Sequence, residues 1–187
     1  MSKLISEDYA SQLKQLHNNS EAFGAGGITV KHYPLIKNLI LQNNVGSILD
    51  YGCGKGHFIE YVKTNMPGVR IEGFDVASEQ YAKLPEGKFD LVVCLDVMEH
   101  VEFGALSHVL SEIRQRAGKI FVCSVANYPA QKKLSDGRNA HVTQLPFGYW
   151  FNLFSGFFKV LKFTVTGEGD QEAIFICSKL RQTANWR

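Results

Sequence analysis

Residues 48–59 read Ile48-Leu49-Asp50-Tyr51-Gly52-Cys53-Gly54-Lys55-Gly56-His57-Phe58-Ile59. The apolar run that ends at Leu49 is typical of a buried strand, and Phe58 begins a segment whose apolar residues recur at helical spacing. Between them lie three glycines at alternate positions, Gly52, Gly54 and Gly56. Because glycine has no Cβ and tolerates positive φ, such a turn lets the backbone approach a ligand closely. The stretch therefore predicts a strand, a tight turn and a helix whose first N–H groups face a ligand.

The spacing of the glycines separates this turn from other ligand-binding loops. The dinucleotide fingerprint has the pattern G-x-G-x-x-G, and the phosphate-binding P-loop requires G-x-x-x-x-G-K-[ST]. Here Asp50 precedes the glycines, and neither Ser nor Thr follows Lys55. The pattern D-x-G-x-G-x-G resembles the first motif of class I S-adenosylmethionine (SAM)-dependent methyltransferases. The resemblance implies that the turn, with Asp50 and Tyr51, lies against the amino-acid part of the cofactor; a glycine-rich turn without a ligand is the alternative.

Length, composition and charge bound the kind of protein. The 187 residues, 45% hydrophobic and 20% charged, suffice for one domain with a substantial core. A net charge of +2 is too small to indicate a nucleic-acid partner by electrostatics alone. Neither a signal peptide nor an apolar run of about 18 residues occurs, so we expect a cytoplasmic protein without a membrane partner. No two cysteines form a CxxC pair, and buried reduced thiols are expected at Cys53, Cys94, Cys123 and Cys177.

A second acidic residue, Asp75, ends the apolar segment 69–75, which we interpret as the next strand. It follows Asp50 by about one strand–helix unit, and an acid at such a strand end accepts hydrogen bonds from ribose hydroxyls. The resemblance implies the same role, with Val76 beside the cofactor. The alternative is that Asp75 caps a helix that begins near Ala77.

The interval between this strand and the next is unusually short. Only residues 76–88 precede the apolar strand 89–95, and they cannot hold the helix, strand and helix that most class I methyltransferases have there. The family's adenine-side acid then has no counterpart, and adenine would contact apolar and backbone groups around Ala77 and Leu84. We expect an α/β fold with a Rossmann-like, doubly wound sheet, mostly parallel, with an antiparallel C-terminal hairpin and without the usual third strand.

We expect one methyltransferase domain spanning 1–187. Two helices, at 4–17 and 30–42, precede the core, and the glycine-containing loop between them is either a lid or a plain connector. Further expected elements are a helix at 106–116, a strand at 119–125, an aromatic helix at 147–154 and hairpin strands at 159–166 and 173–178. The four consecutive parts are 1–44 (N-terminal helices and loop), 45–128 (SAM-binding core), 129–158 (substrate loop and aromatic helix) and 159–187 (closing hairpin).

Residues 95–101, Leu-Asp-Val-Met-Glu-His-Val, resemble the D/E-V-L-E-H-V signature of small-molecule O-methyltransferases such as those of ubiquinone biosynthesis. The resemblance places Asp96 and Val97 beside the cofactor. Methyl transfer from a sulfonium requires an in-line approach and removal of the acceptor's proton. A hydroxyl acceptor therefore needs a base or a metal near this segment.

Candidate catalytic residues are Glu99, His100 and His141. Asp96, Glu99 and His100 share one face if a helix begins here, and His141 lies in the polar loop 136–144. Resemblance to the ubiquinone-type and small-RNA 2′-O-methyltransferases implies a divalent metal, Mg²⁺, Mn²⁺ or Zn²⁺, held by these four side chains. Two alternatives stay open: a metal-free site in which His141 or His100 is the general base, or a purely structural role.

The same loop supplies two candidate substrate-binding residues, Arg138 and Asn139. Residues 136–141 resemble the corresponding stretch of small phage and bacterial methyltransferase-like proteins. The function indicated is SAM-dependent methylation of a hydroxyl on a small molecule or sugar. Methylation of RNA at the 2′-oxygen and a catalytically inactive SAM-binding partner subunit are the alternatives, and the low net charge disfavours nucleic acid.

Overall fold

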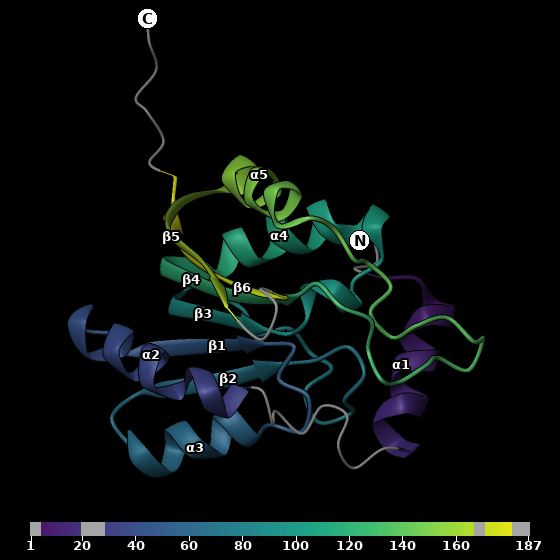
Figure 1. Cartoon of the computed structure of the whole chain (residues 1–187). Coiled ribbons are helices and arrows are strands. Elements are labelled where there is room, and N and C mark those ends of the chain that lie inside the picture. The colour runs from purple at the N-terminus through teal and green to yellow at the C-terminus, as the bar shows by residue number, and fades with distance from the viewer. Residues whose placement is uncertain (1–4, 20–28, 167–170, 181–187) are drawn as a thin grey trace, which may run out of the picture.

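The computed structural model describes residues 5–19, 29–166 and 171–180 (Figure 1). Its strands are β1 (Ser47–Tyr51), β2 (Arg70–Phe74), β3 (Phe89–Leu95), β4 (Ala117–Ala126), β5 (Phe158–Thr166) and β6 (Glu172–Lys179). Its helices are α1 (Glu7–Asn19), α2 (Thr29–Gln42), α3 (His57–Asn65), α4 (Leu106–Arg116) and α5 (Phe147–Phe157), with short 3₁₀ turns η1 (Met98–His100) and η2 (Phe103–Ala105).

The strands form one sheet in the order β2-β1-β3-β4-β6-β5. β1 pairs in parallel with both β2 and β3, and β3 pairs in parallel with β4. β6 runs antiparallel to β4 and to β5, so the C-terminal hairpin closes the sheet as expected. Such a sheet places the carboxyl ends of its four parallel strands at one edge, which is where ligands bind in open α/β folds.

Helices cover both faces of the sheet because its central strands are apolar on both sides (Figure 1). Leu91 and Val93 of β3 pack into the cluster that includes α2 and α3. Val92 and Cys94, which point the other way, pack into the cluster that includes α4 and α5. The sequence-based prediction of a doubly wound α/β sheet is confirmed.

The expected loss of the third strand is also confirmed. β2 is the edge strand of the six-stranded sheet, and residues 76–88 form neither helix nor strand. Since no helix begins near Ala77, the helix that Asp75 was expected to cap under the alternative interpretation does not form. The loop expected to be a lid or a connector falls on residues 20–28, outside the described part of the chain.

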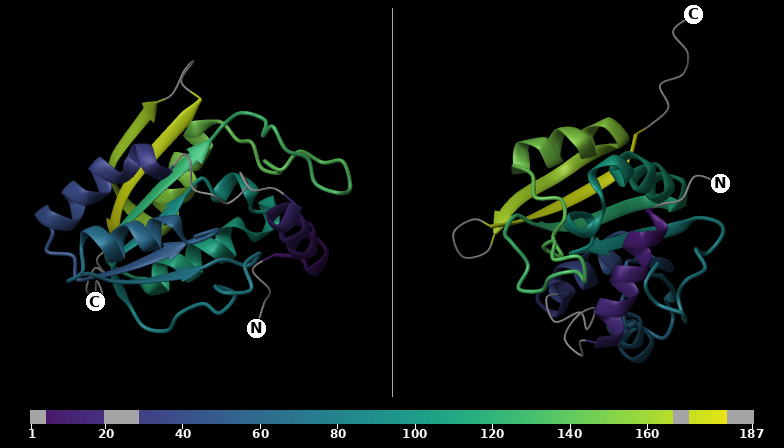
Figure 2. Two further views of the ribbon diagram at one scale, coloured as in Figure 1. Left: turned by 90° about the horizontal axis from the view of Figure 1, so that it is seen from below. Right: turned by 90° about the vertical axis from the view of Figure 1, so that its right-hand side faces the viewer.

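α1 differs from the other helices because it packs on neither face of the sheet. It lies beyond the ends toward which the parallel strands point, beside the chain segment between β4 and α5 (Figures 1 and 2). Its residues Tyr9 and Leu13 form a small apolar cluster with Ala77 and Leu134. α1 therefore stands over the ligand-binding edge. Among the described helices, none combines the length and the apolar character that a membrane span requires.

Candidate active site

The glycine turn between β1 and α3 has the conformation that the sequence predicts. Gly52 and Gly56 have φ values of 83° and 79°, which side-chain-bearing residues rarely adopt. A Cβ on Gly52 would lie 2.3 Å from a methyl group of Val97, and one on Gly56 would lie 2.5 Å from the Tyr81 hydroxyl. The N–H groups of Gly52 and Cys53 donate to the carbonyl of Phe74 at 2.7 and 3.1 Å, which ties the turn to the end of β2.

Asp75 lies directly against this turn. One carboxylate oxygen accepts a hydrogen bond from the Gly54 N–H and the other from the Ala77 N–H, each at 2.8 Å. The side chain is buried, with the residue 8% exposed. Each carboxylate oxygen has a further acceptor position. The two backbone bonds therefore fix the carboxylate and leave capacity for a ligand.

A cavity of about 470 Å³ opens at the carboxyl ends of the parallel strands. Eight of the nine predicted cofactor-binding residues line it: Asp50, Tyr51, Gly52, Gly54, Asp75, Val76, Asp96 and Val97. The ninth, Gly56, shapes the start of α3. The cavity is also lined by the predicted catalytic residues Glu99, His100 and His141, and by Leu13 and His17 of α1.

Acidic groups lie close together near the glycine turn. Burial raises the pKa of Asp50 to about 7, with a further contribution from the negative charge of Asp75. Burial also raises the pKa of Asp96, although a hydrogen bond from Ser124 acts against the shift. A cationic ligand would lower these pKa values again, because its positive charge favours the ionised carboxylates.

The segment after β3 is not the helix on which the predicted grouping of Asp96, Glu99 and His100 depended. Asp96 has a φ of 54° and stands before a single 3₁₀ turn, Met98–His100. Its N–H donates to the Ser124 hydroxyl at 2.9 Å, and the hydroxyl donates to Asp96 Oδ1 at 2.7 Å. This reciprocal pair with β4 holds the unusual backbone and keeps Asp96 facing the cavity.

Glu99 is fully buried at the base of the site. Its Oε1 accepts a hydrogen bond from the Ala126 N–H at 3.0 Å, and Oε2 has no hydrogen-bond partner within the described residues. Burial, reinforced by the nearby charge of Asp96, raises the pKa of Glu99 well above its ordinary value. Burial therefore favours the protonated form of this carboxyl group.

The two candidate histidines lie edge to face, with ring centroids 4.7 Å apart. His141 Nδ1 lies 2.5 Å from the carbonyl oxygen of Tyr128, and His100 Nδ1 lies 2.7 Å from that of Ala140. A carbonyl only accepts, so each Nδ1 carries a proton and the lone pair of the neutral ring is on Nε2. Burial lowers the pKa of His141, and burial together with His141 lowers that of His100 to about 4. Both rings are neutral at pH 7.

The predicted metal ligands do not form a metal site. Within the described ranges, no group of three or more His, Cys, Asp or Glu side chains is arranged to hold an ion. Asp96, Glu99, His100 and His141 line one cavity, but Glu99 accepts a hydrogen bond from the Ala126 N–H, and Asp96 accepts one from the Ser124 hydroxyl. The arrangement within the described residues therefore gives no support to a divalent metal.

The two predicted substrate-binding residues are engaged outside the cavity. Arg138 donates from Nε to Asp136 at 2.7 Å and lies over the ring of Tyr9. The Asn139 amide accepts from the N–H groups of Ala130 and His141 and donates to the Ala130 carbonyl. Neither lines the cavity. Both organise the loop that carries His141, and their contact with substrate stays a prediction.

Sequence reasoning missed residues that position the candidate catalytic and cofactor-binding side chains through distant contacts. Tyr128 fixes His141 through its carbonyl, and Ser124 fixes Asp96. Leu13 and His17 reach the cavity from α1. The amphipathic pattern of α1 predicted that it would pack, but no local signal indicated against which surface.

The sheet, the glycine turn and the acid on the neighbouring strand are those of the Rossmann-like methyltransferases. A family model described as "Methyltransferase domain" matches residues 31–157, more than half of the chain. The chain therefore belongs to this family, as a SAM-dependent methyltransferase.

Relatives of established structure or name agree with this assignment. A ubiquinone biosynthesis O-methyltransferase of Pseudoalteromonas translucida (strain TAC 125) is 30% identical over 63 residues. The match spans 33% of this chain and only 27% of that protein. The fold also superposes on the structure of Burkholderia thailandensis 1,6-didemethyltoxoflavin-N1-methyltransferase, which has 1,6-didemethyltoxoflavin and S-adenosylhomocysteine (SAH) bound. The TM-score is 0.70 at 15% identity, and the match covers 96% of this chain and 92% of that one. N-methyltransferase NodS from Bradyrhizobium japonicum WM9, in complex with SAH, gives 0.65 at 13% identity, covering 92% and 99%.

Proposed function

We propose that this protein transfers the methyl group of SAM to a hydroxyl of a small-molecule or sugar acceptor. The observation that carries the proposal is that one cavity joins the glycine turn and Asp75 to the ring of His141. The first two features suit an adenosyl ligand, and the third suits a base. A cavity of about 470 Å³ is in the range of small-ligand sites.

The cofactor residues act by shape and charge. Gly52 and Gly54 let the amino-acid part of SAM approach the backbone, and Asp75 accepts hydrogen bonds from the ribose. Val97 packs against the turn at Gly52 and borders the same cavity. Asp50 and Asp96 give this end a negative character that favours the positively charged sulfonium over the neutral thioether product.

The reaction needs one base. The acceptor oxygen attacks the methyl carbon in line with the carbon–sulfur bond, that bond's electron pair goes to sulfur, and SAH is formed. The hydroxyl proton passes to Nε2 of His141, whose Nδ1–H is held by the Tyr128 carbonyl. Because burial keeps the pKa of His141 below its ordinary value, the ring is neutral and accepts the proton at pH 7.

The acceptor class follows from the lining of the site. Besides the carboxyls and histidines, the cavity is bordered by apolar groups including Leu95, Val101 and Ala126, which suits a small, partly apolar molecule. The name of the curated relative, an O-methyltransferase, supports oxygen as the acceptor atom. The two solved structures are N-methyltransferases by name, so amines belong in the test.

The experiment has two stages. Calorimetry with SAH and SAM should give heat, and an absence of binding to both would refute the proposal. Transfer of a tritiated methyl group from SAM is then measured with phenols, catechols, sugars, amines and RNA, in EDTA and in Mg²⁺. Labelled phenol, catechol or sugar in EDTA supports the proposal. Label only on amines or RNA refutes the oxygen small-molecule assignment, and strict dependence on Mg²⁺ refutes the metal-free mechanism. SAM binding without any transfer supports the alternative of an inactive partner subunit.

A further inference from the structure

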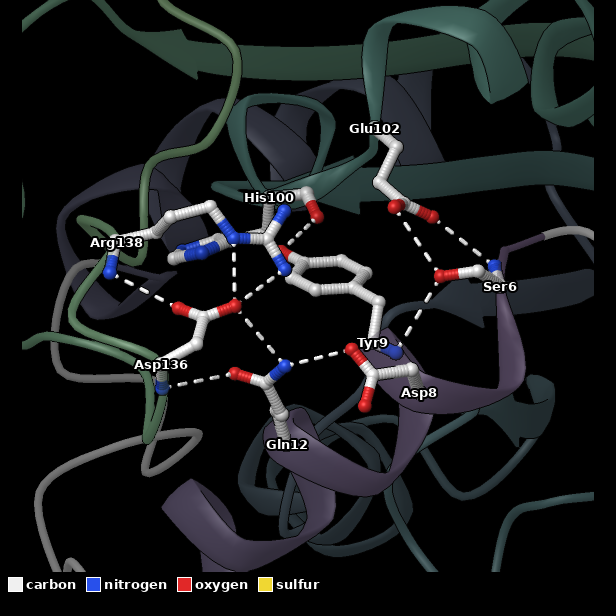
Figure 3. Close-up of polar contacts among 8 residues, drawn as sticks. All are labelled: Ser6, Asp8, Tyr9, Gln12, His100, Glu102, Asp136 and Arg138. Atoms are coloured by element: carbon white, nitrogen blue, oxygen red, sulfur yellow. Dashed lines mark hydrogen bonds and ion pairs between the residues drawn. The ribbon is translucent and has the colours of Figure 1, made fainter.

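α1 is fixed at its N-terminal end against the loop that follows η1. Ser6, which precedes the helix, donates from its N–H to Glu102 at 3.0 Å and from its hydroxyl to the same carboxylate at 3.1 Å (Figure 3). The Tyr9 hydroxyl donates to the carbonyl of His100 at 2.5 Å. The N-terminal half of α1 is therefore joined to the backbone of the catalytic segment.

The middle of α1 is joined to the loop that carries His141. Gln12 donates to the Asp136 carboxylate at 3.0 Å and accepts from the Asp136 N–H at 3.4 Å (Figure 3). Arg138 bonds the same carboxylate and covers the Tyr9 ring, with 5.7 Å between the guanidinium carbon and the ring centroid. Contacts on two separate loops define how α1 is oriented over the cavity.

This orientation brings the C-terminal half of α1 to the adenosine end of the cavity. Leu13 is buried against Ala77, and both border the cavity together with His17. Burial lowers the pKa of His17 most strongly, whereas the negative charge of Asp75 acts to raise it. The imidazole therefore lies within electrostatic reach of the carboxylate that is expected to bind ribose.

Within the described residues, the shortened sheet has no strand beyond β2 that could help to enclose a ligand. β2 is the edge strand, and residues 76–88 supply no helix beyond it. In Figure 2, α1 stands past the tips of the parallel strands. The residues that follow Asp75 and those of α1 are the groups available there to enclose an adenosine.

We propose that His17 is a cofactor-binding residue that hydrogen bonds the ribose beside Asp75, with Leu13 forming the apolar wall of the adenosine site. The inference rests on the proposed binding of SAM at Asp75 and the glycine turn, and it adds a residue that the methyltransferase motifs do not contain. α1 thereby supplies one wall of the adenosine site.

The test measures calorimetric affinities of the full chain for SAH and for 5′-methylthioadenosine, which has the adenosine but lacks the amino acid. We expect His17→Ala to weaken both ligands by a similar factor, about five- to twentyfold, as for loss of one well-placed hydrogen bond. His17→Asn or His17→Gln, whichever reproduces the bonding nitrogen, should come within about threefold of the wild type. His108→Ala, an exposed histidine on α4, is the matched control and should change neither affinity.

Gln12→Ala separates contact from positioning, because Gln12 holds α1 but does not line the cavity. If His17→Ala lowers the melting temperature of the ligand-free chain as much as Gln12→Ala does, and neither His17→Asn nor His17→Gln restores affinity, His17 acts only through the docking of α1, and the inference is overturned. The inference is also overturned if His17→Ala leaves both affinities unchanged, or if it weakens SAH but not 5′-methylthioadenosine. Neither result would contradict the proposed binding of SAM. A wild-type chain that binds neither ligand overturns the proposed function, and this inference with it.

Discussion

Replacing Asp75 with Asn tests whether this side chain both stabilises the glycine turn and binds the cofactor. The substitution keeps the size of the side chain and removes its charge. In the native site the two carboxylate oxygens face two N–H donors, those of Gly54 and Ala77, each at 2.8 Å. Asn has only one acceptor oxygen, so its NH₂ group must face one of these donors.

The magnitude follows from that mismatch. One buried N–H loses its acceptor, which costs about 1–3 kcal/mol in the free energy of unfolding. Burial is the main cause of the raised pKa of Asp50, and the charge of Asp75 adds to it. Removing that charge relieves the repulsion and offsets part of the loss, so we expect about 1–2 kcal/mol. For a chain of this length, that lowers the melting temperature by roughly 2–8 °C. At least one charge-assisted hydrogen bond to the ribose is lost as well, which weakens SAH binding by roughly ten- to 150-fold.

Thermal melting of the ligand-free protein and calorimetry with SAH measure the two effects separately. Glu72→Gln is the matched control, because it makes the equivalent chemical change on β2, the strand that Asp75 follows. The Glu72 side chain is 41% exposed and paired with Arg70. We expect it to change stability by less than about 0.5 kcal/mol and SAH affinity not at all. An Asp75→Asn protein that is destabilised but binds SAH with wild-type affinity would show that Asp75 holds the turn and does not bind the cofactor.

Three further substitutions probe the rest of the site. His141→Gln should lower kcat by about 10²–10⁴-fold and leave SAH affinity unchanged. In the wild type, kcat/KM should fall as the pH drops through the lowered pKa of His141. A pH-independent rate would exclude His141 as the base. Gly52→Ala should abolish SAH binding and destabilise the fold by at least about 1 kcal/mol more than the control Gly87→Ala. Both glycines have a positive φ, but only at Gly52 would a Cβ lie against Val97. Equal losses of stability would refute the role of that contact. Glu99 has a raised pKa in the folded state, so its contribution to stability is full below its unfolded pKa and is lost as pH rises through the folded pKa. In urea denaturation from pH 5 to 8, Glu99→Gln should therefore lose less stability with rising pH than the wild type does. The same dependence of stability on pH in both proteins would mean that Glu99 is ionised.

Element lengths and spacing predicted the sheet well because they depend on local chemistry. The interval 76–88 was too short for a third strand, and the structure has none there. Alternation around the C-terminal turn predicted the β5–β6 hairpin, which the structure confirms. The aromatic helix α5 forms as well, ending at Phe157 instead of the expected 154.

The predicted helical face at Asp96, Glu99 and His100 failed because a contact from another strand decides the backbone there. Ser124 bonds Asp96 on both its N–H and its carboxylate, and these residues are 28 apart in the chain. The predicted metal set is unsupported as well, because no group of three or more His, Cys, Asp or Glu side chains within the described ranges is arranged to hold an ion. Such an arrangement cannot be read from a seven-residue pattern.

By itself the sequence determined the strand, glycine turn and helix, the acid on the neighbouring strand and the shortened sheet. These follow from residue spacing, from the conformational freedom of glycine and from the number of residues that an element requires. Only the tertiary structure decided which nitrogen of His141 bonds the Tyr128 carbonyl and which carboxyls have raised pKa values. It also decided where α1 lies, as shown by Gln12 and Asp136, which meet across 124 residues. Burial and hydrogen bonds between distant residues arise only when the chain is folded, and they set the chemistry of this site.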